Sequence, residues 1–155
     1  MSISKHLTLK EVIKSNTAIR LGIDNAPSMK HLHNLKILAE NVFEPVRTHF
    51  NVPVYVSSCY RSLVLNRAIN GARGSQHLLG MAIDIDQDFR STVSNLEIFN
   101  YIKDNLDFDQ LIWEYTNEDG TPAWIHCSYN KGKNRNQILK AIKIGKKTKY
   151  LKYET

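Results

Sequence analysis

Cysteines and long apolar runs are scarce in this sequence. Its 155 residues include two cysteines, Cys59 and Cys127. This content excludes a disulfide-rich scaffold, and we expect both thiols to be free and buried, as suits a reducing compartment. No apolar run approaches the roughly 20 residues of a membrane-spanning helix, and the N-terminus lacks the apolar block of a signal peptide. We therefore expect a protein made in the cytoplasm without a signal peptide and with no membrane span.

Internal repeats and low-complexity blocks are also absent. A chain of 155 residues is long enough to bury a hydrophobic core without covalent crosslinks, and its length fits one domain of ordinary size. We therefore expect a single domain over residues 1–155, and a monomer.

Acidic residues are nearly missing from the end of the chain. Residues 131–155 hold nine basic side chains and one acid, Glu154, whereas the preceding residues have a net charge of −2. Such a basic C-terminal segment can contact any polyanion, including nucleic acid, teichoic acid or anionic lipid, so it does not identify a partner. A solvated end of the chain is an equally good interpretation.

The hydrophobic pattern predicts a mixture of helices and strands. The strongest helical signal runs from Ser28 to Phe50, with apolar residues at three- and four-residue steps, and Pro45 should kink this helix or end it. A capping box formed by Thr8 and Glu11 starts a shorter helix. The other expected elements are a loop over 17–27, helices over 63–70 and 96–106, strands over 54–59, 81–85, 109–115 and 123–129, a helix or strand over 137–144, and a small terminal hairpin at Gly145.

A turn rich in Asn, Asp and Gly separates the two strands expected at 109–115 and 123–129, which predicts a β-hairpin. If the residues pair about a centre near position 120, Glu114 lies opposite His126 and both side chains share one face. A slip of one residue in the register would separate the two side chains. The hairpin therefore predicts a carboxylate and an imidazole side by side.

The stretch from Ser75 to Asp86 places a histidine and a carboxylate around a glycine. A turn at Gly80 and a short strand after it would aim His77 and Asp84 at one point. His126, in a second strand-like run, offers a third ligand. Two histidines and one carboxylate with an open fourth position are typical of hydrolytic zinc sites. The spacing alone leaves metal binding undecided, because a lone histidine in a strand is more often a core residue.

Three further side chains belong to the candidate site. Hydrolysis needs a general base, and Glu114 is the best candidate because its strand neighbours are apolar and the hairpin brings it near a histidine. Glu118 and Asp119 are rivals, but they lie in the solvated turn. Arg61 follows a strand at a chain reversal, where its planar guanidinium suits either a substrate carboxylate or oxyanion, or a surface salt bridge. Ser75 is either a substrate hydrogen-bond donor or a turn residue.

Three motifs, in this order, resemble the zinc D-Ala-D-Ala carboxypeptidase and peptidoglycan endopeptidase family, whose fold is shared with the Hedgehog signalling domain. The motifs are Ser58-Cys59-Tyr60-Arg61-Ser62, like the family's S-G-Y-R-S; Ser75 to Asp84, like S-x-H-x-x-G-x-A-x-D; and Trp124-Ile125-His126, like W-x-H. They span about half the chain. The resemblance implies an α+β fold in which a small antiparallel sheet carries a zinc site and packs against helices.

The resemblance also implies roles for single residues. It implies zinc ligation by His77, Asp84 and His126, a catalytic base at Glu114, and substrate binding by Arg61 and Ser75. Two positions depart from the family pattern: Cys59 stands where glycine is usual, and Ala123 stands where some relatives carry a glutamate, three residues before the last histidine. Glu114 instead resembles an arrangement in which the base precedes that histidine by a longer hairpin.

The function implied by the resemblance is a zinc peptidase that cuts stem or cross-bridge peptides of bacterial peptidoglycan, as a D-Ala-D-Ala carboxypeptidase-like enzyme or a phage-type endolysin. The basic tail and the expected lack of a signal peptide favour a phage-encoded enzyme that reaches the cell wall after release. An alternative is a non-catalytic, zinc-containing cell-wall-binding module of the same fold, against which the presence of Glu114 and Arg61 argues. Nucleic-acid binding through residues 131–155 is a third hypothesis and predicts a steep salt dependence.

Overall fold

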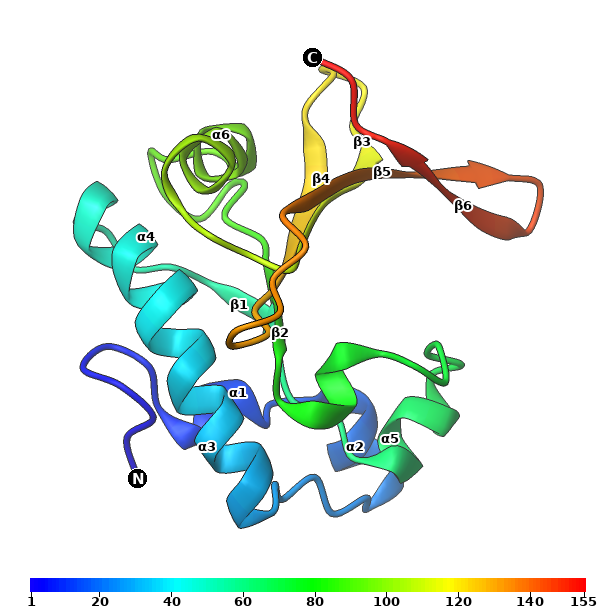
Figure 1. The fold of residues 1–155 in the computed structure, drawn as a ribbon. Helices are drawn as coiled ribbons and strands as arrows, with labels where there is room; N and C mark the ends of the chain where they lie inside the picture. The colour runs from blue at the N-terminus through cyan, green and yellow to red at the C-terminus, as the bar shows by residue number, and fades with distance from the viewer.

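A six-stranded β-sheet forms the centre of the fold in the computed structural model, which describes residues 1–155 (Figure 1). The strand order across the sheet is β1-β2-β4-β3-β5-β6. The strands are β1 Val56–Ser58, β2 Ala82–Ile85, β3 Gln110–Thr116, β4 Pro122–Ser128, β5 Gln137–Ile144 and β6 Lys147–Lys152. The predicted α+β fold is confirmed, and residues 137–144 form a strand that continues into the terminal hairpin.

The sheet differs from the expected antiparallel one at a single pair of strands. β5 runs parallel to β3, whereas every other neighbouring pair is antiparallel. The loop over residues 129–136 causes this, because it carries the chain from the end of β4 back to the start of β3. Asn136 ends the loop with a φ of 48°, and its backbone N–H donates to the carbonyl of Phe108. β5 therefore enters the sheet beside β3 and in the same direction.

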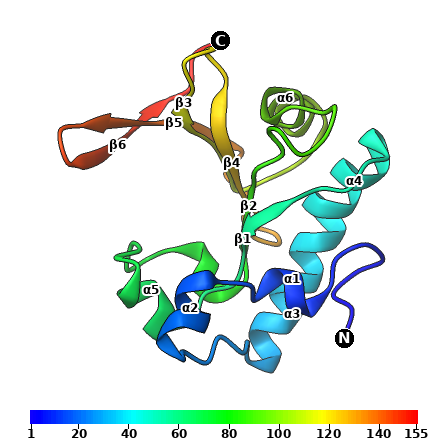
Figure 2. The ribbon, with the colours of Figure 1, turned by 180° about the vertical axis from the view of Figure 1, so that it is seen from behind.

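Short helices pack beside the sheet, and several begin at a serine or threonine whose hydroxyl accepts a backbone N–H from the first turn. Figure 2 shows the same fold from behind. The helices are α1 Leu9–Val12, α2 Asn16–Leu21, α3 Met29–Leu38, η1 Ala39–Phe43, α4 Glu44–Phe50, α5 Leu63–Ala68, η2 Gln76–Leu79 and α6 Asn95–Asn105. The N-cap residues are Thr8, Ser15, Ser28, Ser62, Ser75 and Ser94. None of the helices combines the length and apolar character of a membrane span.

The long helix predicted from Ser28 is confirmed, and its irregularity lies just before Pro45. α3 passes through the π-helical turn η1 into α4, which ends at Phe50. Proline has no N–H, and its ring crowds the carbonyl four residues earlier, here that of Asn41. A π turn widens the helix locally, so the helix accommodates this proline without ending.

The loop predicted over residues 17–27 is wrong, because its first part is helical. α2 begins after Ser15, whose hydroxyl accepts the N–H of Ala18 at 3.2 Å, and it ends at Gly22 with a φ of 63°. Serine before a helix and glycine after it are ordinary helix boundaries. The six residues between them bury only Ala18, so no apolar periodicity marked the segment as a helix.

One face of the sheet packs into the core, and the other carries polar side chains. One face carries apolar side chains that pack with α3, η1, α4 and α6 into the core, and Trp113 meets Phe99 edge-to-face with ring centroids 5.3 Å apart. Successive residues of a strand point to opposite faces. Ile112 and Glu114 of β3, and His126 of β4, therefore lie on the other face, together with Asp84 of β2.

Gly80 makes the turn between η2 and β2, and we expect its replacement by alanine to destabilise the protein. Its φ is 69°, and a Cβ there would lie 2.7 Å from the carbonyl oxygen of His31 and 3.0 Å from Cγ of Leu35. Strain and overpacking together should cost about 2–4 kcal/mol of unfolding free energy. Gly22 has a similar φ of 63° with no atom near its virtual Cβ, so Gly22→Ala should cost about 1 kcal/mol. Equal losses in urea denaturation would contradict the predicted clash.

Candidate metal centre

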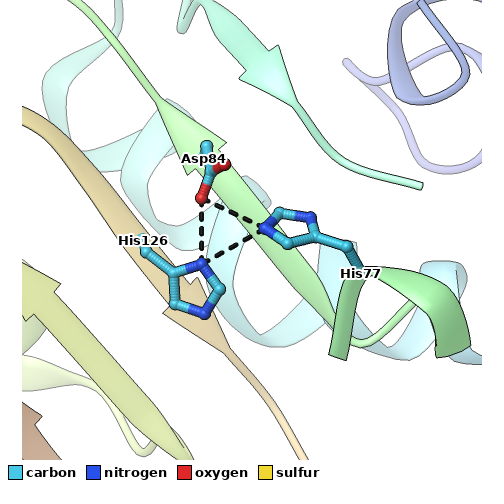
Figure 3. A group of neighbouring side chains, drawn as sticks. All are labelled: His77, Asp84 and His126. Carbon is cyan, nitrogen blue, oxygen red and sulfur yellow. Dashed lines mark hydrogen bonds and ion pairs between the residues drawn. The ribbon is translucent and has the colours of Figure 1, made fainter. Parts of the chain in front are cut away.

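Three side chains converge at one point on the open face of the sheet (Figure 3). Nε2 of His77 lies 3.2 Å from Nδ1 of His126 and 3.3 Å from Oδ1 of Asp84. Nδ1 of His126 lies 2.9 Å from the same Asp84 oxygen. His77 comes from η2, whereas Asp84 and His126 are direct partners on β2 and β4. The fold thus brings together three residues that are up to 49 positions apart.

These three donor atoms fit a zinc ion. Two nitrogens and one carboxylate oxygen are ligands that zinc prefers, and tetrahedral ligands about 2.0–2.1 Å from zinc lie about 3.3 Å from one another. The three separations of 2.9–3.3 Å are close to that value. Three protein ligands leave a fourth position for water, as catalytic zinc sites require.

Backbone contacts fix the ring of His77. Its Nδ1 donates to the carbonyl oxygen of Cys59, and its backbone N–H donates to the hydroxyl of Ser75 at 3.3 Å. A hydrogen bond at Nδ1 selects the tautomer that leaves the Nε2 lone pair free for a metal. Cys59 therefore contributes its carbonyl, while burial raises the pKa of its thiol, which is free as predicted.

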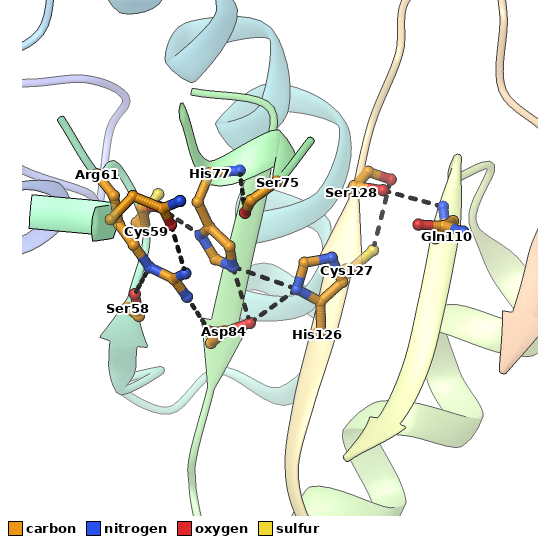
Figure 4. Close-up of polar contacts among 11 residues, drawn as sticks. Ser58, Cys59, Arg61, Ser75, His77, Asp84, Gln110, His126, Cys127 and Ser128 are labelled. Carbon is orange, nitrogen blue, oxygen red and sulfur yellow. Dashed lines mark hydrogen bonds and ion pairs between the residues drawn. The ribbon is translucent and has the colours of Figure 1, made fainter. Parts of the chain in front are cut away.

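Arg61 lies directly against the three-residue cluster (Figure 4). Its Nη2 is 3.5 Å from Oδ2 of Asp84, its Nε donates to Oγ of Ser58 at 3.2 Å, and its backbone N–H donates to the carbonyl of His77. Burial opposes ionisation of Asp84, but its interactions with His77 and His126 outweigh burial and hold the pKa of that carboxyl well below its usual range. Asp84 is therefore an anion at neutral pH, the form in which a carboxylate can bind zinc.

Glu114 shares the face of the cluster, although the predicted pairing with His126 is wrong. Glu114 lies opposite Trp124, and His126 lies opposite Ile112. The centre of the hairpin is one position earlier than expected, which moves each partner by two residues and keeps the same face. Glu114 and His126 are therefore diagonal neighbours, a distance that long side chains can span.

The environment of Glu114 suits a proton acceptor. Its side chain is buried, with 8% of the residue exposed. Burial raises the pKa of its carboxyl, His126 and Arg61 partly oppose this rise, and the charge of Asp84 adds to it, which leaves the pKa at about 7. A carboxyl with a pKa near neutrality is well matched to general acid–base catalysis. The rival Asp119 instead lies in the exposed turn, where it accepts hydrogen bonds from Thr121.

An open cleft of about 900 Å³ leads to the three-residue cluster. One wall comes from residues 69–76, which include Ser75, and the other from the sheet and the segment after β4. Arg61 and Glu114 also line this cleft. All six side chains predicted for the site therefore face one space.

Comparison with known proteins agrees with this geometry. Residues 5–128 match the family model of Peptidase M15. The chain belongs to the Peptidase M15 family. It is therefore a metallopeptidase of a zinc-dependent family that acts on peptidoglycan peptides. No curated protein matches the sequence. The family match ends at Ser128, the last residue of β4, so β5 and β6 of this M15 peptidase lie outside it.

Buried polar side chains that sequence reasoning missed hold the site of this M15 peptidase in place. Asn66 accepts from Nη1 of Arg61 at 3.4 Å and donates to the carbonyl of Ala72. Asp109 accepts from Gln76, the residue before His77, at 2.8 Å. It also accepts two side-chain hydrogen bonds from Arg135, at 2.8 and 2.7 Å. No motif marked these residues, because their roles depend on contacts between distant segments.

Proposed function

We propose that this M15 peptidase hydrolyses peptide bonds in the stem or cross-bridge peptides of bacterial peptidoglycan, with His77, Asp84 and His126 holding zinc. The observation that carries the proposal is the position of Glu114, buried on the same face as the three convergent donor atoms and in the same cleft. A D-Ala-D-Ala carboxypeptidase-like enzyme and an endolysin that acts on the wall after release are the two forms of this activity.

The protein's own residues account for the proton transfers. Zinc in this site supplies Lewis-acid activation of a water molecule and of the scissile carbonyl. Glu114 accepts the proton of the attacking water and returns it to the departing amine, and the rise in its pKa on burial favours both steps. Arg61 directs its guanidinium toward the cleft beside Asp84 and binds a substrate carboxylate or the developing negative charge. Ser75 caps η2 and lines the same wall.

A non-catalytic wall-binding module of the same fold is a weaker hypothesis. Burial of a carboxylate that makes no hydrogen bond is unfavourable, since the charged form loses hydration. The raised pKa of Glu114 arises from that burial without any hydrogen bond. A binding module gains nothing from such a group, whereas a peptidase uses it as the base.

Mass spectrometry of muropeptides from purified peptidoglycan, incubated with the protein, tests the proposed function. We expect cleaved peptides, loss of cleavage after treatment with a chelator, and recovery on adding zinc. Removal of terminal D-alanine alone would identify a carboxypeptidase, whereas opened crosslinks or shortened stems would identify an endopeptidase. Wall binding without cleavage, in the zinc-loaded protein, would overturn the proposal in favour of the binding module.

A further inference from the structure

The face of the sheet that carries the site continues past β3 into the terminal hairpin β5–β6. The pairing is regular from β4 through β3 and β5 to β6, so side chains on one face line up in rows across these four strands. Two rows of side chains cross this face: His126, Ile112, Leu139 and Lys152 form the first, and Trp124, Glu114, Ala141 and Tyr150 form the second. The hairpin is therefore an extension of the site and not a separate appendage, although it lies outside the family match.

Tyr150 is the central side chain of this extension. It lines the cleft and is 53% exposed. Ala141, fully buried, stands between it and Glu114, and neighbouring strands are about 4.8 Å apart, so the Cα atoms of Tyr150 and Glu114 are about 10 Å apart. The small Ala141 side chain puts no bulky group between them, and Glu114 and Tyr150 both line the same cleft. A peptide bound beside Glu114 can therefore also reach Tyr150.

Tyr115 ties the hairpin to the walls of the cleft. Its φ of 58° departs from the strand conformation. Consecutive residues of a regular strand point to opposite faces, but the side chains of Tyr115 and of the preceding Glu114 both line the cleft. Its hydroxyl lies 2.6 Å from Oγ1 of Thr148 on β6, and its ring centroid lies 5.2 Å from that of Trp124. Tyr115, Trp124 and Tyr150 thus give this wall an aromatic surface, which offers large contact area at low conformational cost.

The charge on this wall is positive. Lys143 and Lys152 share the face of Tyr150 by register, and Lys133 lines the cleft nearer the site. No acidic residue lies on either strand of the hairpin, over residues 137–144 or 147–152. The hairpin projects opposite the segment that follows α5, whose residues 69–76 form the other wall (Figure 1). The partner that such a wall fits is an anionic peptide, since lysines on the rim attract carboxylates.

We propose that the hairpin β5–β6 is a substrate-binding wall that holds an acidic peptide beyond the reacting bond, with Tyr150 as its central contact and Lys143 and Lys152 as counter-charges. The inference rests on the proposed peptidase function and adds its substrate preference. It predicts that peptides with free carboxylates bind more tightly than the same peptides with amidated carboxylates.

The first test measures equilibrium binding to the zinc-loaded Glu114→Gln protein, in which bound peptide stays intact. The probes are a synthetic stem pentapeptide with a free glutamate carboxylate and the same peptide with that carboxylate amidated. We expect Tyr150→Ala to weaken binding of the free-acid peptide at least tenfold, and Tyr150→Phe to stay within about threefold, because the ring supplies most of the contact. Unchanged affinity in Tyr150→Ala would overturn the proposal.

The second test separates a specific wall from general attraction to a basic tail. Lys147 and Lys149 are on the same hairpin, but the register places them on the opposite face. Removing either pair of lysines changes the net charge equally, so Lys143→Ala/Lys152→Ala and Lys147→Ala/Lys149→Ala form a matched comparison. We expect the first double variant to lose about tenfold in affinity for the free-acid peptide and most of the preference over the amidated one, with little change in the second.

Equal losses in the two double variants would overturn the proposal and indicate non-specific polyanion attraction. Binding and hydrolysis are measured separately, so failure of the substrate-binding wall can be distinguished from failure of the proposed peptidase function. Peptide bond cleavage by the wild-type protein, with equal affinity in all hairpin variants, would reject the wall alone. Face-dependent binding without any cleavage would support the wall and reject the peptidase.

Discussion

Glu114→Gln is expected to lower kcat by about 10²–10⁴-fold, the usual contribution of a general acid–base residue. Zinc content should stay at one equivalent, because the three convergent donor atoms belong to other residues. KM should change little, since the glutamine keeps the shape of the side chain. Assays on peptidoglycan, together with metal analysis of the same samples, check both expectations. A variant that keeps wild-type kcat with zinc bound would exclude Glu114 as the base.

The pH dependence of the wild-type protein gives a second check on the same residue. The base must be ionised to accept a proton, so kcat/KM should fall about tenfold per pH unit below the pKa of Glu114. That pKa is about 7 in the metal-free chain, and a nearby cation lowers it, which places the acid limb between about pH 5 and 7. Glu118→Gln, in the exposed turn, should leave this limb unchanged, whereas Glu114→Gln should abolish it.

Glu114→Gln should also make the metal-free protein more stable at alkaline pH. Burial raises the folded-state pKa of Glu114 to about 7, whereas an unfolded glutamate titrates near 4.3. The folded state binds the extra proton between these values, so wild-type stability decreases as pH rises from about 4.5 to about 7. Glutamine carries no such penalty, and it should add on the order of 1–3 kcal/mol at pH 8 but little at pH 4.5. Urea denaturation at the two pH values measures the difference.

The sequence carried most of the information about the centre of the site. The spacing of His77, Gly80 and Asp84 predicted a turn that aims two donors at one point, and the structure confirms their convergence with His126. The positions of these residues could be predicted because each depends on a local feature, such as the left-handed φ of Gly80 or the alternation of side chains along a strand. The sequence also predicted that Glu114 shares the face of His126, which the structure shows, whereas its role as the base stays a prediction.

Other features depend on long-range contacts that local patterns do not encode. The parallel entry of β5 is set by the loop over residues 129–136, where Asp109 accepts from the backbone and guanidinium of Arg135. Apolar residues of β5 fit a helix as well as a strand, so its partner could not be predicted. The pairing of Glu114 was wrong by two positions because the turn between β3 and β4 was centred one residue too late. The face was preserved, so Glu114 still lies on the same side of the sheet as His126 despite the error in register.

Asp84 links the two parts of the site, because its two oxygens face different partners. Oδ1 lies within 3.3 Å of both histidines, and Oδ2 faces Arg61 at 3.5 Å. The guanidinium therefore orients the carboxylate from the side away from the ring nitrogens. Since Arg61 also lines the cleft, the proposed metal ligand and the proposed substrate-binding cation are in contact at one carboxylate.

His126→Ala is expected to abolish both zinc binding and peptidase activity. The substitution removes one of three donor atoms and leaves His77 and Asp84, which provide only two. Free zinc at 100 times its Kd stabilises a folded protein by about 2.7 kcal/mol. For a chain of this size that corresponds to a rise in Tm of roughly 5–10 °C. We expect this rise in the wild-type protein and none in His126→Ala at the same zinc concentration.

His33→Ala is the matched control for that experiment, because it also removes one histidine but from the exposed side of α3. It should keep one equivalent of zinc, the full rise in Tm and wild-type activity. Without zinc, His126→Ala should still unfold cooperatively, since the apolar core lies on the opposite face of the sheet. Cooperative unfolding would show that the variant is folded and has lost only its zinc binding. A variant at His126 that retains one equivalent of zinc and the full thermal shift would show that the metal lies elsewhere. Loss of zinc with a normal fold would instead establish that β4 supplies the third ligand.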